Sequence, residues 1–507
     1  MRPFADYSLA LPKISHSIGA TSSTSEADLA KVLITGITHN DSDVQAGDLF
    51  IALPGAKRHG AEFATNAQKQ GAVAVVTDAA GAKLISGIPV LVVANPRLVA
   101  GRIAALFYGE PMRDLSGVAI TGTNGKTTVS TLLYQIFEAA HRDCGLIGTV
   151  ETRIGSEVIA SKRTTPEATD LQAFAAVMKE RHMRHLVIEA SSHAMIMHRV
   201  EGAHFAIAAF TNLTHDHLDF HGDMESYFLA KASLFNFSFA DLACINIDDA
   251  YGARLATATE LPVLTVSRFN PQAVWHFIEI DSQSKRVQLK IRGAGGILIE
   301  TSTSLRGGHN YDNLLMAISI AVELGVDPID IAAIVPNIIG AAGRLEEITI
   351  GQDFTALVDY AHTPDAVSNV LASIREFTTG KVIAVLGCGG DRDASKRPLM
   401  AAAAESVAHH LVLTSDNPRS ELPDQIVRDM QQGLKAPEKA RQELDRAQAI
   451  FQTVMQAGQR DVILIAGKGH EDTQEIAGVK YPFDDRVHAH NALVQRAREI
   501  QPTGVQA

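Results

Sequence analysis

Residues 121–128 (TGTNGKTT) combine glycines, a lysine and hydroxyl side chains between an apolar run and a helix-forming run. Glycines let backbone N–H groups turn toward phosphate oxygens, and the N-terminus of the following helix adds a favourable dipole. Lys126 would reach the β- and γ-phosphates of a nucleotide, and Thr127 would offer its hydroxyl to Mg²⁺. The spacing departs from the GxxxxGK[ST] pattern, because Ile120 stands where that pattern has its first glycine. The context still predicts ATP binding, against the alternative of a glycine-rich turn with an incidental lysine.

Carboxylates and imidazoles follow two apolar runs downstream of this loop. Glu189 comes directly after one of them, and residues 212–221 read NLTHDHLDFH. An acid at the carboxyl end of a parallel strand lies where ligands bind in open α/β sheets. So many His and Asp side chains need a polar partner, and a metal ion is the simplest one. A solvated histidine-rich loop is one alternative. The pattern His215-x-His217-x-Asp219 also resembles binuclear metallohydrolases, but the phosphate loop argues against that class.

The elements that must position these residues alternate between short β-branched runs and longer Ala/Leu-rich stretches. Runs typical of buried strands are 73–76, 90–93, 118–120, 186–190, 205–213, 243–248, 355–360, 382–387, 411–415 and 462–467. This alternation predicts parallel βαβ units and an α/β fold. Residues 280–306 differ, and their pattern predicts an antiparallel ribbon.

Turn-rich segments at 108–117 and 340–344 divide the chain into three parts. A length of 507 residues also corresponds to roughly three domains, at about 150 residues per domain. We therefore predict domains over residues 1–110, 111–342 and 343–507.

Composition excludes several classes of protein. The net charge of −12 argues against non-specific coating of nucleic acid or anionic membrane. Cys144, Cys244 and Cys388 are far apart, which excludes a disulfide framework or a cysteine zinc site and fits a reducing compartment. The sequence shows no signal peptide and no apolar run long enough to span a membrane. We expect a soluble, cytoplasmic monomer without nucleic-acid or membrane partners.

A series of short motifs stands in order along the chain. They are TGTNGKTT (121–128), EASSH (189–193), NLTHDHLDFHGDMESYFLAKASLF (212–235), HNYDN (309–313), GRLE (343–346), DYAHTPDA (359–366), GCGGDRDASKRP (387–398), DNPR (416–419) and AGKGHED (466–472). The series resembles the Mur ligase family, and within it the ligases that add 2,6-diaminopimelate. Residues 37–63 resemble the nucleotide-sugar-binding part of those enzymes.

The resemblance implies an N-terminal UDP-binding domain, a central ATPase domain of P-loop type with a parallel sheet, and a Rossmann-like C-terminal domain. The implied reaction belongs to peptidoglycan precursor synthesis. ATP phosphorylates the D-glutamyl γ-carboxylate of UDP-N-acetylmuramoyl-L-alanyl-D-glutamate. The amine of meso-2,6-diaminopimelate then attacks the acyl phosphate, and phosphate leaves.

The resemblance also implies roles for individual residues around the nucleotide. The ATP-binding set is Gly122, Thr123, Asn124, Gly125, Lys126, Thr127, Thr128, His309, Asn310, Asn313, Arg344 and Asp359. The catalytic set is Lys126, Glu189, His217 and Lys231, and the Mg²⁺ ligands are Thr127, Glu189, His217 and Lys231. Lys231 matches the lysine that the family carbamylates, and a carbamate, unlike an ammonium, is an oxygen donor for Mg²⁺. Spacing alone instead predicts a solvent-facing helix lysine.

Two further sets are implied for the other substrates. The set for the UDP-sugar dipeptide is Ser42, Ala56, Lys57, Arg58, Thr164, Thr165, Ser191, Met197 and Arg199. Here Met197 and the neighbouring Arg163 depart from the Gln and Asn that are common in relatives. The set for diaminopimelate is Arg392, Asp416, Asn417, Pro418, Arg419, Gly467 and Glu471. Arg419 suits the second carboxylate of diaminopimelate, because a guanidinium binds a carboxylate with two hydrogen bonds.

Four alternatives stay open from the sequence. A lysine-adding ligase typically lacks an arginine at the position of Arg419, and a folylpolyglutamate synthase-like ligase would lack the complete N-terminal part. A kinase would use the same phosphate loop but leave phosphate on a product. A non-catalytic nucleotide-binding module would not need Lys126, Glu189, His217 and Lys231 together.

Overall fold

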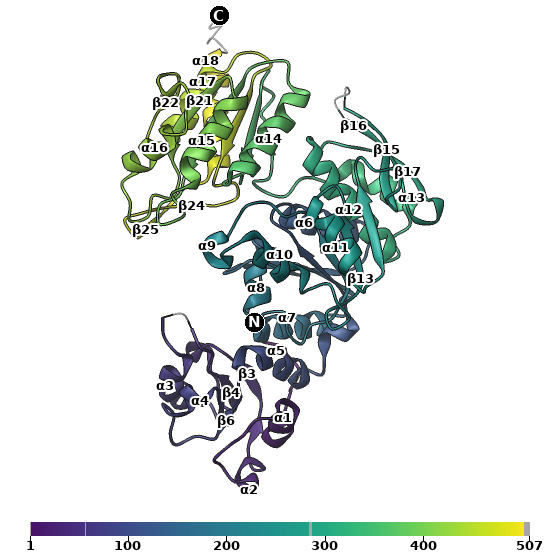
Figure 1. The fold of residues 1–507 in the computed structure, drawn as a ribbon, viewed down its shortest axis with the longest axis vertical. Coiled ribbons are helices and arrows are strands. Elements are labelled where there is room, and N and C mark those ends of the chain that lie inside the picture. Colours follow the sequence, from purple (N-terminus) through teal and green to yellow (C-terminus); the bar gives the residue numbers. More distant parts are fainter. Residues whose placement is uncertain (1, 56, 283–285, 501–507) are drawn as a thin grey trace, which may run out of the picture.

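Three sheet-centred bodies are stacked along the long axis of the molecule, in chain order from bottom to top in Figure 1. This computed structural model describes residues 2–55, 57–282 and 286–500. The strands of the main sheets come from residues 36–92, 116–303 and 346–466. Every predicted strand run overlaps an observed strand, which confirms the α/β fold with sheets that are mainly parallel. The boundaries near residues 110 and 342 fall between sheets and stay predictions.

The first body is built on a four-stranded parallel sheet. Its order is β3 (Gly36–Thr38), β4 (Asp48–Ile51), β5 (Ala74–Thr77) and β6 (Val90–Val92). The other elements here are β1 (Leu9–Ala10), α1 (Leu11–Ile18), α2 (Glu26–Leu29), β2 (Leu33–Ile34), α3 (Ala64–Gln70), α4 (Ala79–Ala82) and α5 (Pro96–Phe107). The Asn95 side chain caps α5 by accepting from the backbone N–H groups of Arg97 and Leu98, which fixes where this helix leaves the sheet.

An eleven-stranded sheet forms the second body. Its parallel centre runs β8 (Cys144–Ile147), β11 (His185–Glu189), β7 (Ser116–Thr121), β12 (Phe205–Phe210), β13 (Ala240–Asn246), β14 (Val263–Ser267) and β15 (Trp275–Asp281). Its antiparallel edges are β9 (Glu151–Ile154) with β10 (Glu157–Ala160), and β16 (Val287–Arg292) with β17 (Leu298–Thr303). The β16–β17 pair confirms the predicted ribbon. The strand β8 was missed by the sequence analysis.

Helices cover both faces of this sheet. One face packs against α6 (Lys126–Ala139) and α12 (Gly308–Glu323). The other packs against α7 (Ala168–Glu180), α10 (Met224–Ala232) and α11 (Ala250–Ala258). Shorter helices are α8 (Ser192–Ile196), α9 (Leu218–His221) and α13 (Pro328–Ile334). In the register of β11 on β7, Glu189 pairs with Ile120, so Glu189 lies level with the start of the glycine-rich loop.

The third body has the layers of a Rossmann-like fold. Its sheet runs β18 (Glu346–Ile348), β19 (Thr355–Asp359), β23 (Val462–Ala466), β20 (Val382–Cys388), β21 (His410–Ser415) and β22 (Arg441–Gln442), with only β18 antiparallel among these strands. One face packs against α14 (Pro364–Phe377), α15 (Lys396–Val407) and α16 (Pro423–Gln431), and the other against α17 (Arg446–Gln456) and α18 (Asp485–Ile500). A hairpin of β24 (Thr473–Ile476) and β25 (Val479–Pro482) projects from it.

Two sequence-based exclusions can be compared with this fold. Cys144, Cys244 and Cys388 are all buried and free. Within the described residues, no helix has both the length and the apolar character required to cross a membrane.

A buried ion pair fixes the ends of two strands in the third body. The Arg446 guanidinium donates to Asp485 at 2.6 and 2.7 Å, and to the backbone carbonyls of Ser415 and Ala466 at 3.0–3.2 Å. Both charged side chains are fully buried. The pair therefore holds together the carboxyl ends of β21 and β23, from which the predicted amino-acid-binding residues extend.

We predict that Arg446→Met destabilises the protein by about 3–5 kcal/mol, because it leaves the Asp485 carboxylate buried without its cation. Chemical denaturation measures the loss. The control is Arg428→Met, since Arg428 pairs with Asp424 on the exposed face of α16 and this pair contributes little. Equal destabilisation by the two variants would contradict the prediction.

Candidate active site

The glycine-rich loop joins β7 to α6, which confirms the predicted strand–loop–helix order. Gly122 and Gly125 have φ angles of 146° and 87°, a region that residues with a Cβ rarely adopt. Polar contacts hold the loop from one side. The Asn124 N–H donates to the Asn212 side chain at 2.9 Å, and the Thr211 hydroxyl donates to the Asn124 carbonyl at 2.6 Å. The loop is thus fixed in one conformation by the end of β12.

Lys126 and the buried Lys231 meet at the carbonyl of Gly122. Lys126 Nζ donates to the carbonyls of Gly122 and Thr123, and Lys231 Nζ donates to that of Gly122, each at 2.8 Å. Burial lowers the pKa of both side chains, and Lys126 lowers that of Lys231 further. The solvent-facing position that spacing alone gave Lys231 is wrong, because this residue is 1% exposed.

Glu189 lies near Lys126, at the end of β11, and is 1% exposed. Its carboxylate accepts from the Thr127 hydroxyl at 3.0 Å and from the N–H and hydroxyl of Thr149 at 2.8 and 2.9 Å. Thr149 was not predicted, because it follows the strand β8 that the sequence analysis missed. The structure therefore brings together Lys126, Thr127, Glu189 and Lys231.

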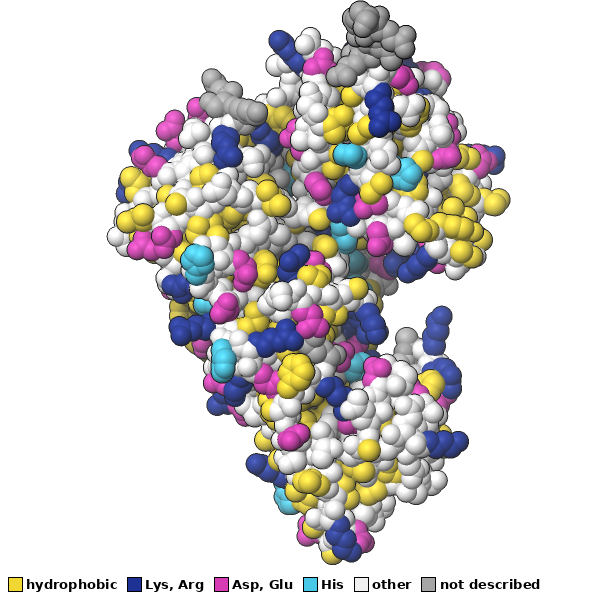
Figure 2. Space-filling model, turned by 180° about the vertical axis from the view of Figure 1, so that it is seen from behind, with side chains coloured by type: hydrophobic (Ala, Val, Ile, Leu, Met, Phe, Trp, Pro, Cys, Tyr) yellow, Lys and Arg dark blue, Asp and Glu magenta, His cyan; other side chains and the backbone are white. Residues whose placement is uncertain are grey.

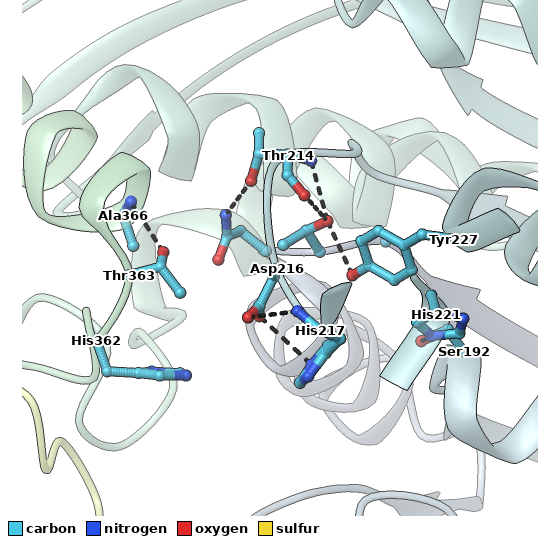
Figure 3. A network of polar contacts seen from close by, with 12 residues as sticks. Ser192, Thr214, Asp216, His217, His221, Tyr227, His362, Thr363 and Ala366 are labelled. Carbon is cyan, nitrogen blue, oxygen red and sulfur yellow. Dashed lines mark hydrogen bonds and ion pairs between the residues drawn. The ribbon is translucent and has the colours of Figure 1, made fainter. Parts of the chain in front are cut away.

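Imidazoles line the next part of the site (Figure 3). The rings of His193 and His217 lie 4.9 Å apart, and His221 contacts the Ser192 hydroxyl at 2.9 Å and the ring of Tyr227. Burial lowers the pKa of His217 to about 4, against the opposing effect of Asp216. His217 is therefore neutral near pH 7 and can act as a ligand or acceptor.

The predicted metal ligands do not form a cluster by themselves. In the described part of the chain, no group of three or more His, Cys, Asp or Glu side chains is placed to hold a metal ion. A Mg²⁺ ion here would instead take one or two oxygen ligands from the protein and the others from phosphate and water, as is usual for nucleotide sites.

The third body reaches this site through Lys396. Its Nζ lies 2.7 Å from Asp216 Oδ1, and Asp216 also accepts from the backbone N–H of His217 at 2.9 Å. Burial raises the pKa of Asp216, but His217, Lys396 and His362 together hold it at about 2. The sequence predicts a metal partner for the His and Asp side chains of residues 212–221, whereas the pairing of Asp216 with Lys396 appears only in the fold.

A cavity of about 440 Å³ lies between the second and third bodies, next to the loop. Its lining contains most of the predicted nucleotide residues: Asn124, Gly125, Thr128, His309, Asn310, Asn313, Arg344 and Asp359. Arg344 donates to the Thr127 hydroxyl at 3.5 Å, and its guanidinium stacks on the Tyr360 ring at 4.4 Å. The sequence analysis missed Tyr360 and the pair Arg268–Asp312 in the same lining.

The residues predicted for diaminopimelate follow the ends of β20, β21 and β23. Asn417 donates to the Glu471 carboxylate at 2.8 Å, and Arg419 donates to the carbonyl of Gly390 at 2.6 Å. Arg392 and Arg419 both border Gly389. The set also includes Asp416, Pro418 and Gly467, whose φ is 120°. Lys468 was missed; it is fully buried and lies 3.1 Å from Glu471, so Glu471 already has a cation beside it.

The residues predicted for the UDP-sugar dipeptide fall into two groups. Thr164, Thr165, Ser191 and Arg199 lie next to Glu189, and the Thr165 hydroxyl donates to the Glu189 carbonyl at 2.7 Å. Met197 lines a crevice nearby. Ser42, Lys57 and Arg58 lie in the first body, and Ala56 is outside the described residues. Figure 2 shows a wide notch between the first and third bodies, bordered by Lys and Arg side chains.

Fold and site together define a multidomain α/β protein in which a glycine-rich loop on one parallel sheet faces a Rossmann-like sheet. Family models described as "Mur ligase family, catalytic domain", "Mur ligase middle domain" and "Mur ligase, glutamate ligase domain" match residues 33–108, 120–321 and 343–469. The chain belongs to the Mur ligase family.

Named relatives align with this chain over nearly its whole length. A UDP-N-acetylmuramoyl-L-alanyl-D-glutamate–2,6-diaminopimelate ligase of Streptomyces coelicolor is 47% identical, over 97% of this chain and 98% of the relative. The similarly named protein of Aquifex aeolicus is 39% identical, over 90% and 94%. A solved structure of that name has a TM-score of 0.69 at 33% identity, covering 97% of this chain and 99% of the other. MurF from Acinetobacter baumannii shares the fold, with a TM-score of 0.66 at 17% identity over 91% and 96%.

We predict that Lys396→Met loosens the third body from the glycine-rich loop, because the nearly buried Asp216 carboxylate loses its cation. Hydrogen exchange of the backbone amides around residues 214–217 and 360–363 should become faster. Lys439→Met, at an exposed lysine of the third body, is the matched control and should leave these amides unchanged. Equal exchange in the Lys396→Met variant and the unmodified protein would show that the ion pair does not hold the bodies together.

Proposed function

We propose that this chain is an ATP-dependent amide ligase that adds meso-2,6-diaminopimelate to the D-glutamyl γ-carboxylate of UDP-N-acetylmuramoyl-L-alanyl-D-glutamate. One observation carries the proposal. The glycine-rich loop, with Lys126, Lys231 and Glu189 around it, faces the sheet of the third body. The loops that follow the strands of this sheet carry Arg392 and Arg419. Such a site suits the joining of an activated acid to an amine. The names of the most similar relatives support the choice of substrates.

The chemistry needs positive charge, because a carboxylate that attacks a triphosphate meets strong repulsion. Lys126 comes from the loop and Arg344 from the opposite side of the cavity, so both can neutralise the phosphates. A γ-carboxylate oxygen bonds to the γ-phosphorus and ADP leaves. The amine then attacks the acyl carbon, and inorganic phosphate leaves with the former carboxylate oxygen.

The side chains near the loop fit Mg²⁺. The Thr127 hydroxyl and the Glu189 carboxylate oxygen lie 3.0 Å apart, and oxygen donors are the ligands that this ion prefers. When bound, Mg²⁺ would neutralise phosphate charge. Thr127, Glu189 and the neutral His217 are the residues that would hold it or its water shell.

The burial of Lys231 supports its carbamylation. Burial lowers the pKa of this side chain and so raises the share of free amine, which adds to CO₂ and releases a proton to give a carbamate. The modification would replace a cation that is repelled by Lys126 with an anion that Lys126 attracts. The carbamate would also give the site a further oxygen ligand for Mg²⁺.

Recognition of the amino acid is assigned to the third body. The distal carboxylate of diaminopimelate needs a cation that donates two hydrogen bonds, and Arg419 with Arg392 supplies such groups. L-Lysine lacks this carboxylate, so it would not make these two hydrogen bonds.

The function is tested by phosphate release in the presence of ATP, Mg²⁺ and UDP-N-acetylmuramoyl-L-Ala-D-Glu, with meso-diaminopimelate or L-lysine added in parallel. We expect phosphate and a tripeptide product with diaminopimelate alone. Equal turnover with lysine would contradict the role of Arg419 in amino-acid specificity but would still support the proposed ligase activity. A phosphorylated product that persists in the presence of amine would instead indicate a kinase.

Replacing Lys231 by alanine should lower ligation at least about 100-fold, because the site loses a ligand and a buried charge. The ¹³C NMR signal of a carbamate in ¹³CO₂-treated protein should also disappear. Lys179→Ala, at a partly exposed helix lysine that pairs with Asp114, is the control and should keep both signal and activity. Unchanged ligation by Lys231→Ala would remove the carbamate from the proposal.

A further inference from the structure

Glu167 lies where the first body meets the second and faces three guanidinium groups. Its carboxylate is 3.1 Å from Arg97 Nη1, 3.2 Å from Arg199 Nε and 3.7 Å from Arg163 Nη1. The Glu167 side chain is 7% exposed, and those of Arg97 and Arg199 are 15% and 13% exposed. Glu167 occupies the N-cap position of α7 but caps no backbone group with its side chain, so the carboxylate is directed to the arginines.

Arg97 connects Glu167 to the first body. Its Nε and Nη2 both donate to the carbonyl of Pro54 at 3.3 Å. Pro54 begins the turn that contains Lys57 and Arg58, which are proposed to bind the uridine nucleotide. The position of this turn therefore depends on where Glu167 holds the Arg97 guanidinium.

Arg199 connects Glu167 to the reacting end of the site. Its Nη1 donates to the Thr165 carbonyl at 3.4 Å, and Thr165 in turn donates to the carbonyl of Glu189. A continuous series of polar contacts thus runs from Pro54 through Arg97, Glu167 and Arg199 to the strand end beside the phosphate loop.

The backbone around this series is packed closely. A Cβ added to Gly101 of α5 would collide with the carbonyl of Glu201, and one added to Gly202 would meet the carbonyl of Gly101. His39 of the first body contacts the Thr169 hydroxyl of α7 at 2.8 Å. Figure 1 shows α5 lying along α7 at this junction. The two bodies therefore meet through a rigid contact, and the polar series sets the distance between their binding groups.

Charge gives Glu167 a specific role in this contact. Arg97, Arg163 and Arg199 would repel one another without a central anion, and burial already lowers the pKa of Arg199. One carboxylate compensates one of the three positive charges, so the cluster keeps an excess that attracts an anionic ligand. The proposed substrate is such a ligand, because it carries a pyrophosphate at one end and peptide carboxylates at the other.

We propose that Glu167 is a positioning residue for the UDP-sugar dipeptide: it holds Arg97 against the nucleotide-binding turn and Arg199 against the peptide-binding strand end. The inference rests on the proposed function, since it needs a ligand that spans both bodies. Neither Glu167 nor Arg97 has to touch the reacting atoms.

The test compares Glu167→Gln with Glu201→Gln. Glu201 is the matched control, because it lies at the same junction and contacts Arg102 and His198, away from the polar series. We expect Glu167→Gln to raise the KM for UDP-N-acetylmuramoyl-L-Ala-D-Glu about tenfold, with the KM values for ATP and diaminopimelate unchanged. Glu201→Gln should leave all three KM values unchanged. A general structural defect would instead raise every KM or lower thermal stability without this selectivity.

The energetic coupling between Arg97 and Glu167 provides the second readout. Arg97→Met alone should raise the same KM, and the double variant Arg97→Met with Glu167→Gln should be no worse than the poorer single variant. Multiplied effects would show that the two residues act separately and would overturn the inference.

Calorimetric titration separates this inference from the proposed function. The unmodified protein should bind the UDP-sugar dipeptide, and Glu167→Gln should bind it more weakly. Failure of the unmodified protein to bind the dipeptide would overturn both the function and the inference. Equal binding by the variant and the unmodified protein would overturn the inference alone.

Discussion

Lys126 and the buried Lys231 donate to one backbone carbonyl, and the rest of the site is arranged around this concentration of positive charge. Burying an ammonium is unfavourable unless anions compensate it. Glu189 and Asp216 lie close enough to contribute, and Thr127 and Thr149 fix the Glu189 carboxylate. The positive charge that these carboxylates leave uncompensated favours the binding of anions, such as the triphosphate and carboxylate groups of the substrates. The same electrostatics that make the free site unfavourable therefore favour its substrates.

The three bodies contribute in different ways. The first is joined to the second by close backbone packing and by the series of polar contacts through Glu167. The third approaches through fewer polar contacts near the loop, among them Lys396 with Asp216 and Arg344 with Thr127. Because the cavity lies between the second and third bodies, a nucleotide bound there would contact residues of both.

Much of the fold was predictable from sequence because buried parallel strands are short, apolar and rich in β-branched residues. The strand β8 (Cys144–Ile147) was not predicted because it is short and contains a glycine, and Thr149, which follows it, was not predicted either. The phosphate loop was recognisable from its local order of strand, glycines and helix. Glu189 was recognisable from its place directly after an apolar run, whereas the role of Lys231 required the family resemblance.

The rest depends on contacts between residues far apart in the chain. Asp216 and Lys396 form an ion pair across 180 positions, and Arg97 meets Glu167 across 70. No periodicity marks such pairs. Lys231 shows that spacing can also fail within one helix. Both faces of α10 are partly covered, and Tyr227, one turn away, is buried beside Lys231. Spacing gives the face of a helix but not what packs against it.

The central claim is that ATP activates the γ-carboxylate at this site, and oxygen labelling tests it most directly. UDP-N-acetylmuramoyl-L-Ala-D-Glu would be prepared with ¹⁸O in the γ-carboxylate and turned over with ATP and diaminopimelate. If ATP activates the γ-carboxylate, each released phosphate carries one ¹⁸O atom from it, since the acyl phosphate cleaves at its carbon–oxygen bond. Phosphate without label, with product formed, would contradict the account.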